Sequence, residues 1–440
     1  MGGATRDANA VTGGRIRDYV SEMGPSWVAG SIAAGPATMA SLVAAGASFD
    51  YALLWVVVLS AVAGALAQYL AMRLGLLTEQ GIVGVVEEHL GETWAWILVA
   101  DVVVAAGVAQ LVIMNTVAAV SATMTGVDAR IWGVVWALVL VAGLAGEGYR
   151  FVELAAKVLV SGVVLAFVAS LFVAPIDPGR AAAGLVPSLP AGSAVVAAGI
   201  LGGAVHITLI TMHSYTMRAR GWTEREYGLA TFDVGASMLV AFGVYSVAIF
   251  LVTASVLTDP DLTTVSAAQA LGPLVGPGAK WLFLLGLGGA AVSTLGGNTI
   301  VPPFLVADKL GWGTTVEDTR YRALLAAVAL LSAPGAFIGG QVLGQLVLVL
   351  ALGTVGTPFA IAVVIYLLNS AAVPEPTPTL ANVGGMGLLA VSGGLAANFV
   401  RGQVAGGVDA LSGVVLAFAV VLGVATVALL GKFAHEEAAA

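Results

Sequence analysis

Long apolar segments alternate with short polar ones along nearly the whole chain of 440 residues. A helix needs about 20 apolar residues to span the hydrocarbon core of a bilayer. Twelve segments suit this role, at 25–47, 51–72, 93–123, 131–146, 154–174, 194–217, 229–257, 267–298, 321–338, 342–368, 382–400 and 408–431. We therefore predict an all-α integral membrane protein with about twelve transmembrane helices.

The composition agrees with a surface that faces lipid. Apolar residue types make up 59% of the chain and charged types 10%, whereas soluble domains carry about 25% charged residues. There is no cysteine, so disulfides and thiolate metal sites are excluded. No motif predicts a cofactor, an enzymatic activity, an ATP-binding loop or a nucleic-acid partner. The lipid bilayer is the partner that the composition predicts.

The distribution of Lys and Arg predicts the orientation. With a cytoplasmic N-terminus, 13 of the 17 basic residues lie on the inner side. These are Arg6, Arg15, Arg17, Arg73, Arg150, Lys157, Arg218, Arg220, Arg225, Lys309, Arg320, Arg322 and Lys432. Arg130, Arg180, Lys280 and Arg401 remain outside. We expect a multi-pass protein of the plasma membrane with its N-terminus in the cytoplasm and an even number of spans.

Two spans carry helix-breaking residues near their middle. The first contains Gly35-Pro36, and proline removes a helix donor and disfavours helix in the residue before it. The sixth contains Gly202-Gly203, followed by Val205-His206. Interrupted helices at matching positions of two halves are typical of inverted-repeat transporters, which bind substrate at the breaks. The predicted parts are a tail at 1–23, repeats at 24–175 and 194–368, two added helices at 380–431, and a tail at 432–440.

Ionisable residues at membrane depth are rare and often functional. His206 stands at the break of the sixth span and is the preferred site residue. It could bind an anion, ligate a metal, carry a proton, or simply bond a carbonyl freed by the break. Asp101 could relay protons or pair with a neighbouring helix, and we favour a structural role for His213. Gln345 in the tenth span could face the breaks or bond a neighbouring helix.

Several motifs together resemble the Nramp family of divalent-metal transporters, which have the LeuT-type fold. The first span reads Gly35-Pro36-Ala37-Thr38, then Ala45-Gly46-Ala47-Ser48-Phe49-Asp50-Tyr51, where the family has DPGN and a segment like AGAxFGY. Further similar motifs are Arg73-Leu74-Gly75, Gly148-Tyr149-Arg150, the stretch from Leu201 to Ser214, Ser293-Thr294, Gly344-Gln345 and Pro358. The resemblance covers most of the chain.

The chain departs from the family at the residues that bind metal. Gly35 and Thr38 stand where the family has the Asp and Asn of DPGN. The sixth-span Met and His are replaced by His206 and Thr208, Gly203 holds the position of the carbonyl ligand, and Gln345 matches the tenth-span Gln. The acids of the family's proton route appear as neutral residues around Val108 and Gln110, with Asp101 kept. Such a pocket has no anion to offset a divalent charge.

The resemblance implies alternating-access transport of a divalent metal ion such as Mn²⁺ or Fe²⁺, with proton coupling, by a monomer with an altered site. The expected substrate-binding residues are Gly35, Thr38, Gly203, His206, Thr208 and Gln345, with His206 and Gln345 as metal ligands. The expected proton pathway is Asp101, His206 and His213. Two alternatives stay open: a transporter of a small non-metal solute, and a non-transporting sensor or structural relative on the same fold.

Overall fold

The computed structural model describes residues 19, 24, 33–144, 149–257, 263–373, 375–405 and 410–439, which form helices and no strand. The α-helices are α3 (Pro36–Phe49), α4 (Leu54–Thr78), α5 (Ile82–Leu90), α6 (Glu92–Thr125), α7 (Ala129–Leu144), α8 (Tyr149–Ser170), α9 (Pro178–Ala183), α10 (Ala194–Ala204), α11 (Ile207–Ala219), α12 (Tyr227–Val234), α13 (Gly243–Val256), α14 (Thr264–Ala268), α15 (Gly272–Val275), α16 (Ala279–Lys309), α17 (Thr319–Leu331), α18 (Val342–Gly353), α19 (Thr357–Leu368), α20 (Thr379–Ala405) and α21 (Ala410–Ala439). Shorter turns are η1 (Asp50–Leu53), η2 (Glu224–Glu226), the π-helix η3 (Gly235–Phe242), η4 (Gln269–Leu271), η5 (Gly276–Gly278) and η6 (Ala333–Phe337).

Wherever the predicted spans are described, they fall on helices or on interrupted helices, which confirms the predicted all-α fold class. Within the described residues, eight helical segments are long and apolar enough to cross a membrane, and two shorter apolar helices lie at Ala129–Gly143 and Val158–Ser170. The start of the first predicted span and the tail at 1–23 lie outside the described residues, apart from Tyr19.

The eighth predicted span starts within one residue of the apolar segment Ser266–Lys309 but ends too early, and its first part is not continuous α-helix. Residues 267–278 do not belong to the long helix, because prolines near Gly272 and Gly276 divide them into α14, η4, α15 and η5. The helix α16 begins at Ala279 and continues through Pro302 and Pro303 to Lys309, beyond the predicted end at 298. A third interruption, between α18 and α19, falls inside the predicted tenth span.

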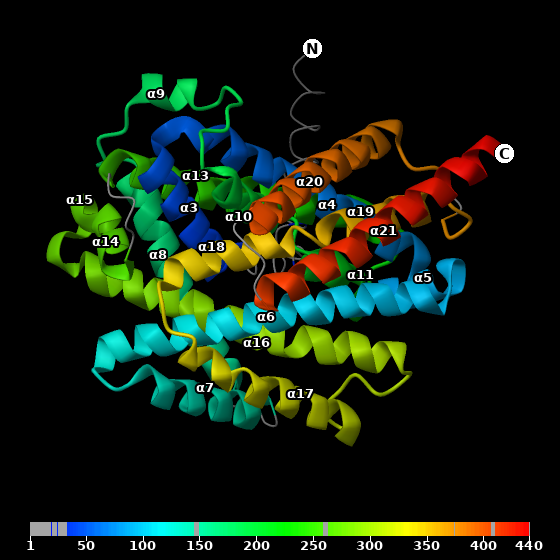
Figure 1. Cartoon of the computed structure of the whole chain (residues 1–440), viewed down its shortest axis with the longest axis horizontal. Helices are drawn as coiled ribbons and strands as arrows, with labels where there is room; N and C mark the ends of the chain where they lie inside the picture. The colour runs from blue at the N-terminus through cyan, green and yellow to red at the C-terminus, as the bar shows by residue number, and fades with distance from the viewer. Residues whose placement is uncertain are drawn as a thin grey trace, which may run out of the picture.

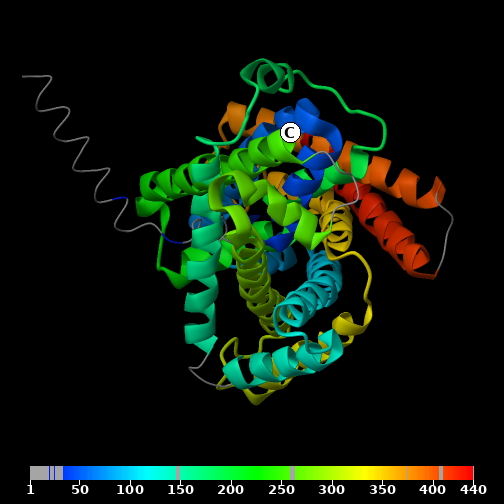
Figure 2. The same ribbon diagram turned by 90° about the vertical axis from the view of Figure 1, so that its left-hand side faces the viewer.

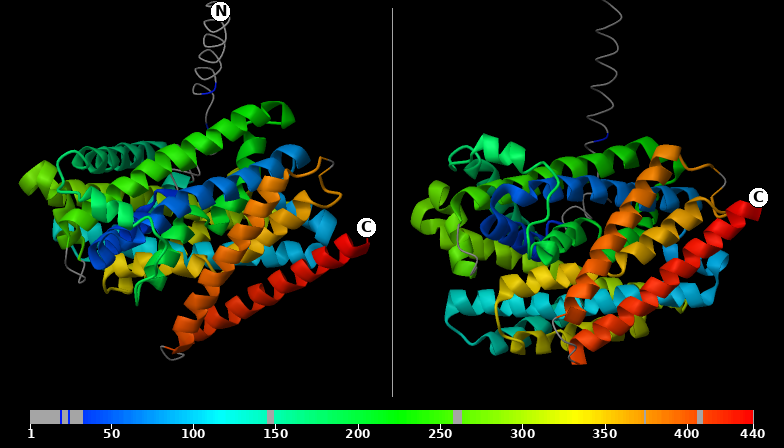
Figure 3. Two further views of the ribbon diagram at one scale, coloured as in Figure 1. Left: turned by 90° about the horizontal axis from the view of Figure 1, so that it is seen from above. Right: turned by 45° about the horizontal axis from the view of Figure 1, so that its top comes forward.

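The interrupted helices lie at the centre of the bundle. The helices α3, α10 and α18 pack on one another, and α6 and α16 run side by side next to them (Figure 1). The helices α7 and α17 form an outer layer beyond α6 and α16 (Figure 2). The helices α20 and α21 cover another side, against α19 (Figure 3). Of the eight spans, those at 194–219 and 342–368 are the most buried, as central helices should be.

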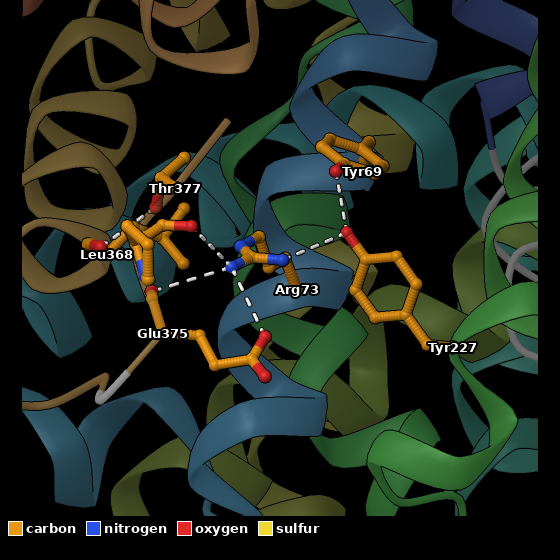
Figure 4. Close-up of polar contacts among 7 residues, drawn as sticks. Tyr69, Arg73, Tyr227, Leu368, Glu375 and Thr377 are labelled. Carbon is orange, nitrogen blue, oxygen red and sulfur yellow. Dashed lines mark hydrogen bonds and ion pairs between the residues drawn. The ribbon is translucent and has the colours of Figure 1, made fainter. Parts of the chain in front are cut away.

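Polar contacts close both ends of the bundle. At one end, the loop that contains α9 is fixed to the start of α4, because Trp55 donates its backbone N–H to Gly184 and its indole N–H to Ser188 (2.9 and 2.8 Å). At the other end, the Tyr215 hydroxyl of α11 donates to Asp308 of α16 (2.7 Å). The buried Arg73 of α4 binds the start of α12 and the linker between α19 and α20 (Figure 4).

Candidate functional site

The first break lies directly before α3. Gly35 is extended (ψ 179°), and Pro36 takes the first helical position, where its missing N–H costs nothing. Two carbonyls freed by this break accept hydrogen bonds from hydroxyl groups. The Thr38 hydroxyl donates to Ala33 (2.5 Å), and the Tyr245 hydroxyl of α13 donates to Ala34 (3.2 Å). Hydroxyl groups of the same chain therefore satisfy these two backbone carbonyls.

The second break separates α10 from α11 at Val205 and His206. The backbone of His206 is extended (φ −60°, ψ 137°), so that α11 starts afresh at Ile207. The carbonyl of Val205 accepts a hydrogen bond from the hydroxyl of Thr357, the first residue of α19 (3.1 Å). Interruption of the sixth span, predicted from its sequence, is confirmed.

The side chain of His206 is buried at this break. Its Nδ1 lies 2.8 Å from the hydroxyl oxygen of Thr208 and 3.4 Å from the Thr208 backbone nitrogen, and so caps the N-terminus of α11. The ring also packs on Gly353, the last residue of α18, because a Cβ there would lie 2.8 Å from both Cδ2 and Nε2. Position 353 therefore has no room for a larger residue while the ring keeps this place.

A cavity of about 50 Å³ lies where the two breaks meet. The first break contributes Gly35 to Thr38 and the second contributes Gly203, His206 and Thr208. The helix α16 adds Thr294 and Asn298, while α6 and α18 add Ala109, Ile113, Val349 and Leu350. Five of the six predicted substrate-binding residues are thus brought together, and a Cβ at Gly203 would collide with the Thr38 hydroxyl. The described residues in the walls offer hydroxyls, an amide and one imidazole, and no carboxylate.

Gln345 is not among the residues that line this cavity. It is half-buried near the start of α18, where its Oε1 accepts a hydrogen bond from the Asn115 amide (2.6 Å). Its Nε2 donates to the carbonyl of Gly339 (2.6 Å). The residues of α18 that line the cavity are Val349 and Leu350, at least one turn further along the helix. The sequence predicted Gln345 for this role.

The two other residues of the predicted proton pathway are both buried. Asp101 of α6 is 1% exposed, and neither carboxylate oxygen has a hydrogen-bond partner in the described part of the chain. The carboxylate packs on Gly356, three residues after Gly353 in the turn that separates α18 from α19. His213 lies about two turns after His206 on α11 and is 1% exposed. Neither residue lines the cavity.

Gly353, Thr357 and Tyr245 contribute to the site but were missed from the sequence. The sequence contains a pattern that could have indicated Gly353 and Thr357. Residues 353–358 include glycines and a proline, the residue types that mark the breaks in the first and sixth spans. Tyr245 carried no signal, because a tyrosine in an apolar helix is ordinary. Its role is visible only once α13 is seen to pack on α3.

Comparisons with known proteins agree with this architecture. A family model described as natural resistance-associated macrophage protein-like (Nramp) matches residues 26–401. The divalent metal cation transporter MntH of Mycobacterium tuberculosis is 27% identical over 371 residues, which cover 80% of this chain and 84% of that protein. MntH of Yersinia pestis is 29% identical over 316 residues, covering 65% and 73%.

Solved structures share the fold at low sequence identity. The manganese transporter of Eremococcus coleocola aligns over 95% of this chain and 94% of its own, with a TM-score of 0.71 and 16% identity. MhsT in complex with L-phenylalanine aligns over 85% and 97%, with a TM-score of 0.53 and 14% identity. The nucleobase-cation-symport-1 family transporter Mhp1 aligns over 87% and 94%, with a TM-score of 0.51 and 15% identity.

Proposed function

The chain belongs to the Nramp family, and from this premise we propose that it is a secondary transporter that carries a divalent metal ion by alternating access. Relatives that match most of its length are named divalent metal cation transporters. The cargo site is the cavity at the two helix breaks, where inverted-repeat transporters bind their substrates. The proposed binding residues that line it are Gly35, Thr38, Gly203, His206 and Thr208.

The size of the cavity is the observation that carries this proposal. A water molecule takes up about 30 Å³ of liquid, so roughly one or two waters, or an ion with one water, would fill the space of about 50 Å³. Sites for organic ligands are about 300–1,000 Å³. The small size of the cavity therefore favours an ion over the small organic solute that was the alternative.

Uptake into proteoliposomes tests the proposal. The purified chain would be reconstituted around a metal-sensitive dye, and Mn²⁺, Fe²⁺, Ni²⁺ and Zn²⁺ added outside one at a time. We expect saturable uptake of at least one ion, reduced about tenfold or more by His206→Ala. His435→Ala is the matched control, because His435 is exposed near the end of α21. If a folded protein takes up none of these ions, the proposal is wrong.

We also propose proton coupling, with Asp101, His206 and His213 as the pathway. Support comes from the burial of all three and from the Asp101 carboxylate, which has no hydrogen-bond partner within the described residues. A pH-sensitive dye inside the vesicles measures proton flux during metal uptake. Asp101→Asn is expected to remove the dependence of uptake on a pH gradient while metal binding remains. If uptake by Asp101→Asn depends on the pH gradient as in the wild type, Asp101 is not part of the pathway. The same assay on His213→Gln tests His213 by the same criterion.

The oligomeric state and orientation complete the proposal. We propose a monomer, because the two helix breaks of a single chain meet at the cavity. We place the N-terminus in the cytoplasm and the protein in the plasma membrane, because the Lys and Arg residues would then lie mainly inside. Light scattering of the purified protein tests the monomer, since a stable dimer would double the protein mass.

A further inference from the structure

One ring nitrogen of His206 is engaged and the other has no hydrogen bond to any described residue. Nδ1 lies 2.8 Å from the Thr208 hydroxyl oxygen and 3.4 Å from the Thr208 backbone nitrogen. Nε2 lies beside Gly353, and His206 is among the residues that line the cavity. The imidazole is therefore fixed at Nδ1 and by packing, which leaves Nε2 for a cargo.

The Thr208 hydroxyl accommodates either neutral form of this imidazole. When Nδ1 accepts from the Thr208 N–H, the ring proton lies on Nε2, which then has no free lone pair. When Nδ1 carries the proton, it donates to the Thr208 hydroxyl oxygen and the Nε2 lone pair is free. A hydroxyl can donate or accept, so both arrangements keep the contact of 2.8 Å. The second arrangement is the one that metal-binding histidines use, with the other ring N–H given to an oxygen partner.

The remaining walls of the cavity favour particular ions. The carbonyls of Ala33, Ala34 and Val205 at the breaks already accept hydrogen bonds from hydroxyls of the chain. Among the described residues, no Asp, Glu or Cys lines the cavity, and no group of three or more His, Cys, Asp or Glu side chains could hold a metal. Hard ions such as Mg²⁺ and Mn²⁺ prefer anionic oxygen ligands, whereas imidazole suits Ni²⁺, Cu²⁺ and Zn²⁺.

Building on the proposed transport function, we propose that the cargo is a nitrogen-preferring divalent ion of the Ni²⁺, Cu²⁺ and Zn²⁺ class, bound by Nε2 of His206. Thr208 and Gly353 are positioning residues for this ligand. The Thr208 hydroxyl oxygen can accept the Nδ1 proton in the tautomer that exposes the Nε2 lone pair, and Gly353 leaves space for the ring beside the cavity. A single protein nitrogen with neutral oxygens gives weak binding, which suits an ion that must also leave.

Ion selectivity tests the class of cargo. Zn²⁺ and Mn²⁺ would be titrated separately into the full chain in nanodiscs by calorimetry, and both would be followed in the uptake assay. We expect Zn²⁺ to bind at least about tenfold more tightly than Mn²⁺, in line with the general order of divalent-ion affinities. This preference should vanish in His206→Ala and persist in His435→Ala. Uptake of Mn²⁺ with equal or tighter Mn²⁺ binding would overturn this inference but leave the transport proposal intact.

The positioning roles have their own readouts. Thr208→Val should weaken Zn²⁺ binding by about 10–100-fold, the usual effect of losing such a partner, while Thr208→Ser should retain it. Pulsed electron paramagnetic resonance with Cu²⁺ should show the distal imidazole nitrogen in the wild type and in Thr208→Ser, and lose it in His206→Ala. Wild-type affinity in Thr208→Val, or no imidazole signal in the wild type, would overturn the proposal.

Gly353 is tested with a matched glycine on the same helix. Gly353→Ala would place a Cβ against the ring and should abolish Zn²⁺ binding, whereas Gly344→Ala has no atom within 4 Å of the new Cβ and should bind normally. If Gly353→Ala folds poorly, His206→Ala/Gly353→Ala should recover the thermal stability of His206→Ala, because the collision is gone. A double variant as unstable as Gly353→Ala would contradict the role assigned to position 353.

Discussion

Nη1 of Arg73, near the end of α4, donates a hydrogen bond to the hydroxyl oxygen of Tyr227, at the start of α12, over 3.1 Å. The same guanidinium donates to the carbonyl of Pro376 (3.0 Å) and lies 3.8 Å from the Glu375 carboxylate (Figure 4). Its side chain is 5% exposed. One buried cation therefore joins α4, α12 and the linker between α19 and α20.

Removal of this cation should destabilise the protein. Arg73→Met removes the hydrogen bonds to Tyr227 and Pro376, and a hydrogen bond from a charged group contributes about 1.5–3 kcal/mol. Arg73→Lys should restore only part of the loss, because an ammonium lacks the planar fork of the guanidinium. Thermal unfolding in detergent measures the effect, with Arg320→Met as the control because Arg320 is exposed. Equal melting temperatures for Arg73→Met and Arg320→Met would contradict the assignment.

Thr357 should stabilise the break between α10 and α11. Its hydroxyl donates to the carbonyl of Val205, so Thr357→Val leaves that buried carbonyl unpaired at a cost of about 1–3 kcal/mol. Thr357→Ser keeps the hydroxyl and should keep most of the stability. Thermal unfolding of the two variants checks this. A serine variant that loses as much stability as the valine variant would show that the methyl group, and not the hydroxyl, matters.

Gln345 should be dispensable for cargo affinity. Its amide is bonded to Asn115 and to the carbonyl of Gly339, away from the cavity. Gln345→Ala should therefore lower the melting temperature and leave the KM for metal uptake within about twofold of the wild type. A large rise in KM with unchanged stability would return Gln345 to the set of metal ligands that the sequence suggested.

The proposed orientation can be tested directly because the chain contains no cysteine. Single cysteines at Ala182, in α9, and at Glu317, between α16 and α17, would both be exposed. In intact cells, a membrane-impermeant maleimide should label Ala182→Cys and reach Glu317→Cys only after lysis. The reverse pattern would show that the N-terminus lies outside.

The helices and the first two breaks were predictable because they depend on local composition. A run of apolar residues must be helical in lipid. Gly35-Pro36 stands at the start of α3, and Gly202-Gly203 lie in the last turn of α10, just before the second break. The third break was missed although Gly353 and Gly356 have the same local character. The apolar run at 342–368 continues on both sides of these glycines, so composition alone predicts a single span there.

The site could be predicted only in part, since its contacts join residues that are distant in the sequence. His206 and Thr208 were found because they stand at a break. The position of Gln345 could not be predicted. A shift of about one turn along α18 separates Gln345, which bonds to Asn115, from Val349 and Leu350, which line the cavity. The hydroxyl bonds from Tyr245 and Thr357 to the broken helices follow from packing between helices, which no local pattern encodes.

Anomalous X-ray diffraction at the zinc absorption edge, from crystals of the full chain grown with Zn²⁺, tests the central claim most directly. The account predicts an anomalous peak in the cavity between Gly35 and Thr208, about 2.0–2.1 Å from Nε2 of His206, and no such peak in His206→Ala. A cavity without a peak at saturating Zn²⁺, or a peak bound to other residues and unaffected by His206→Ala, would contradict it.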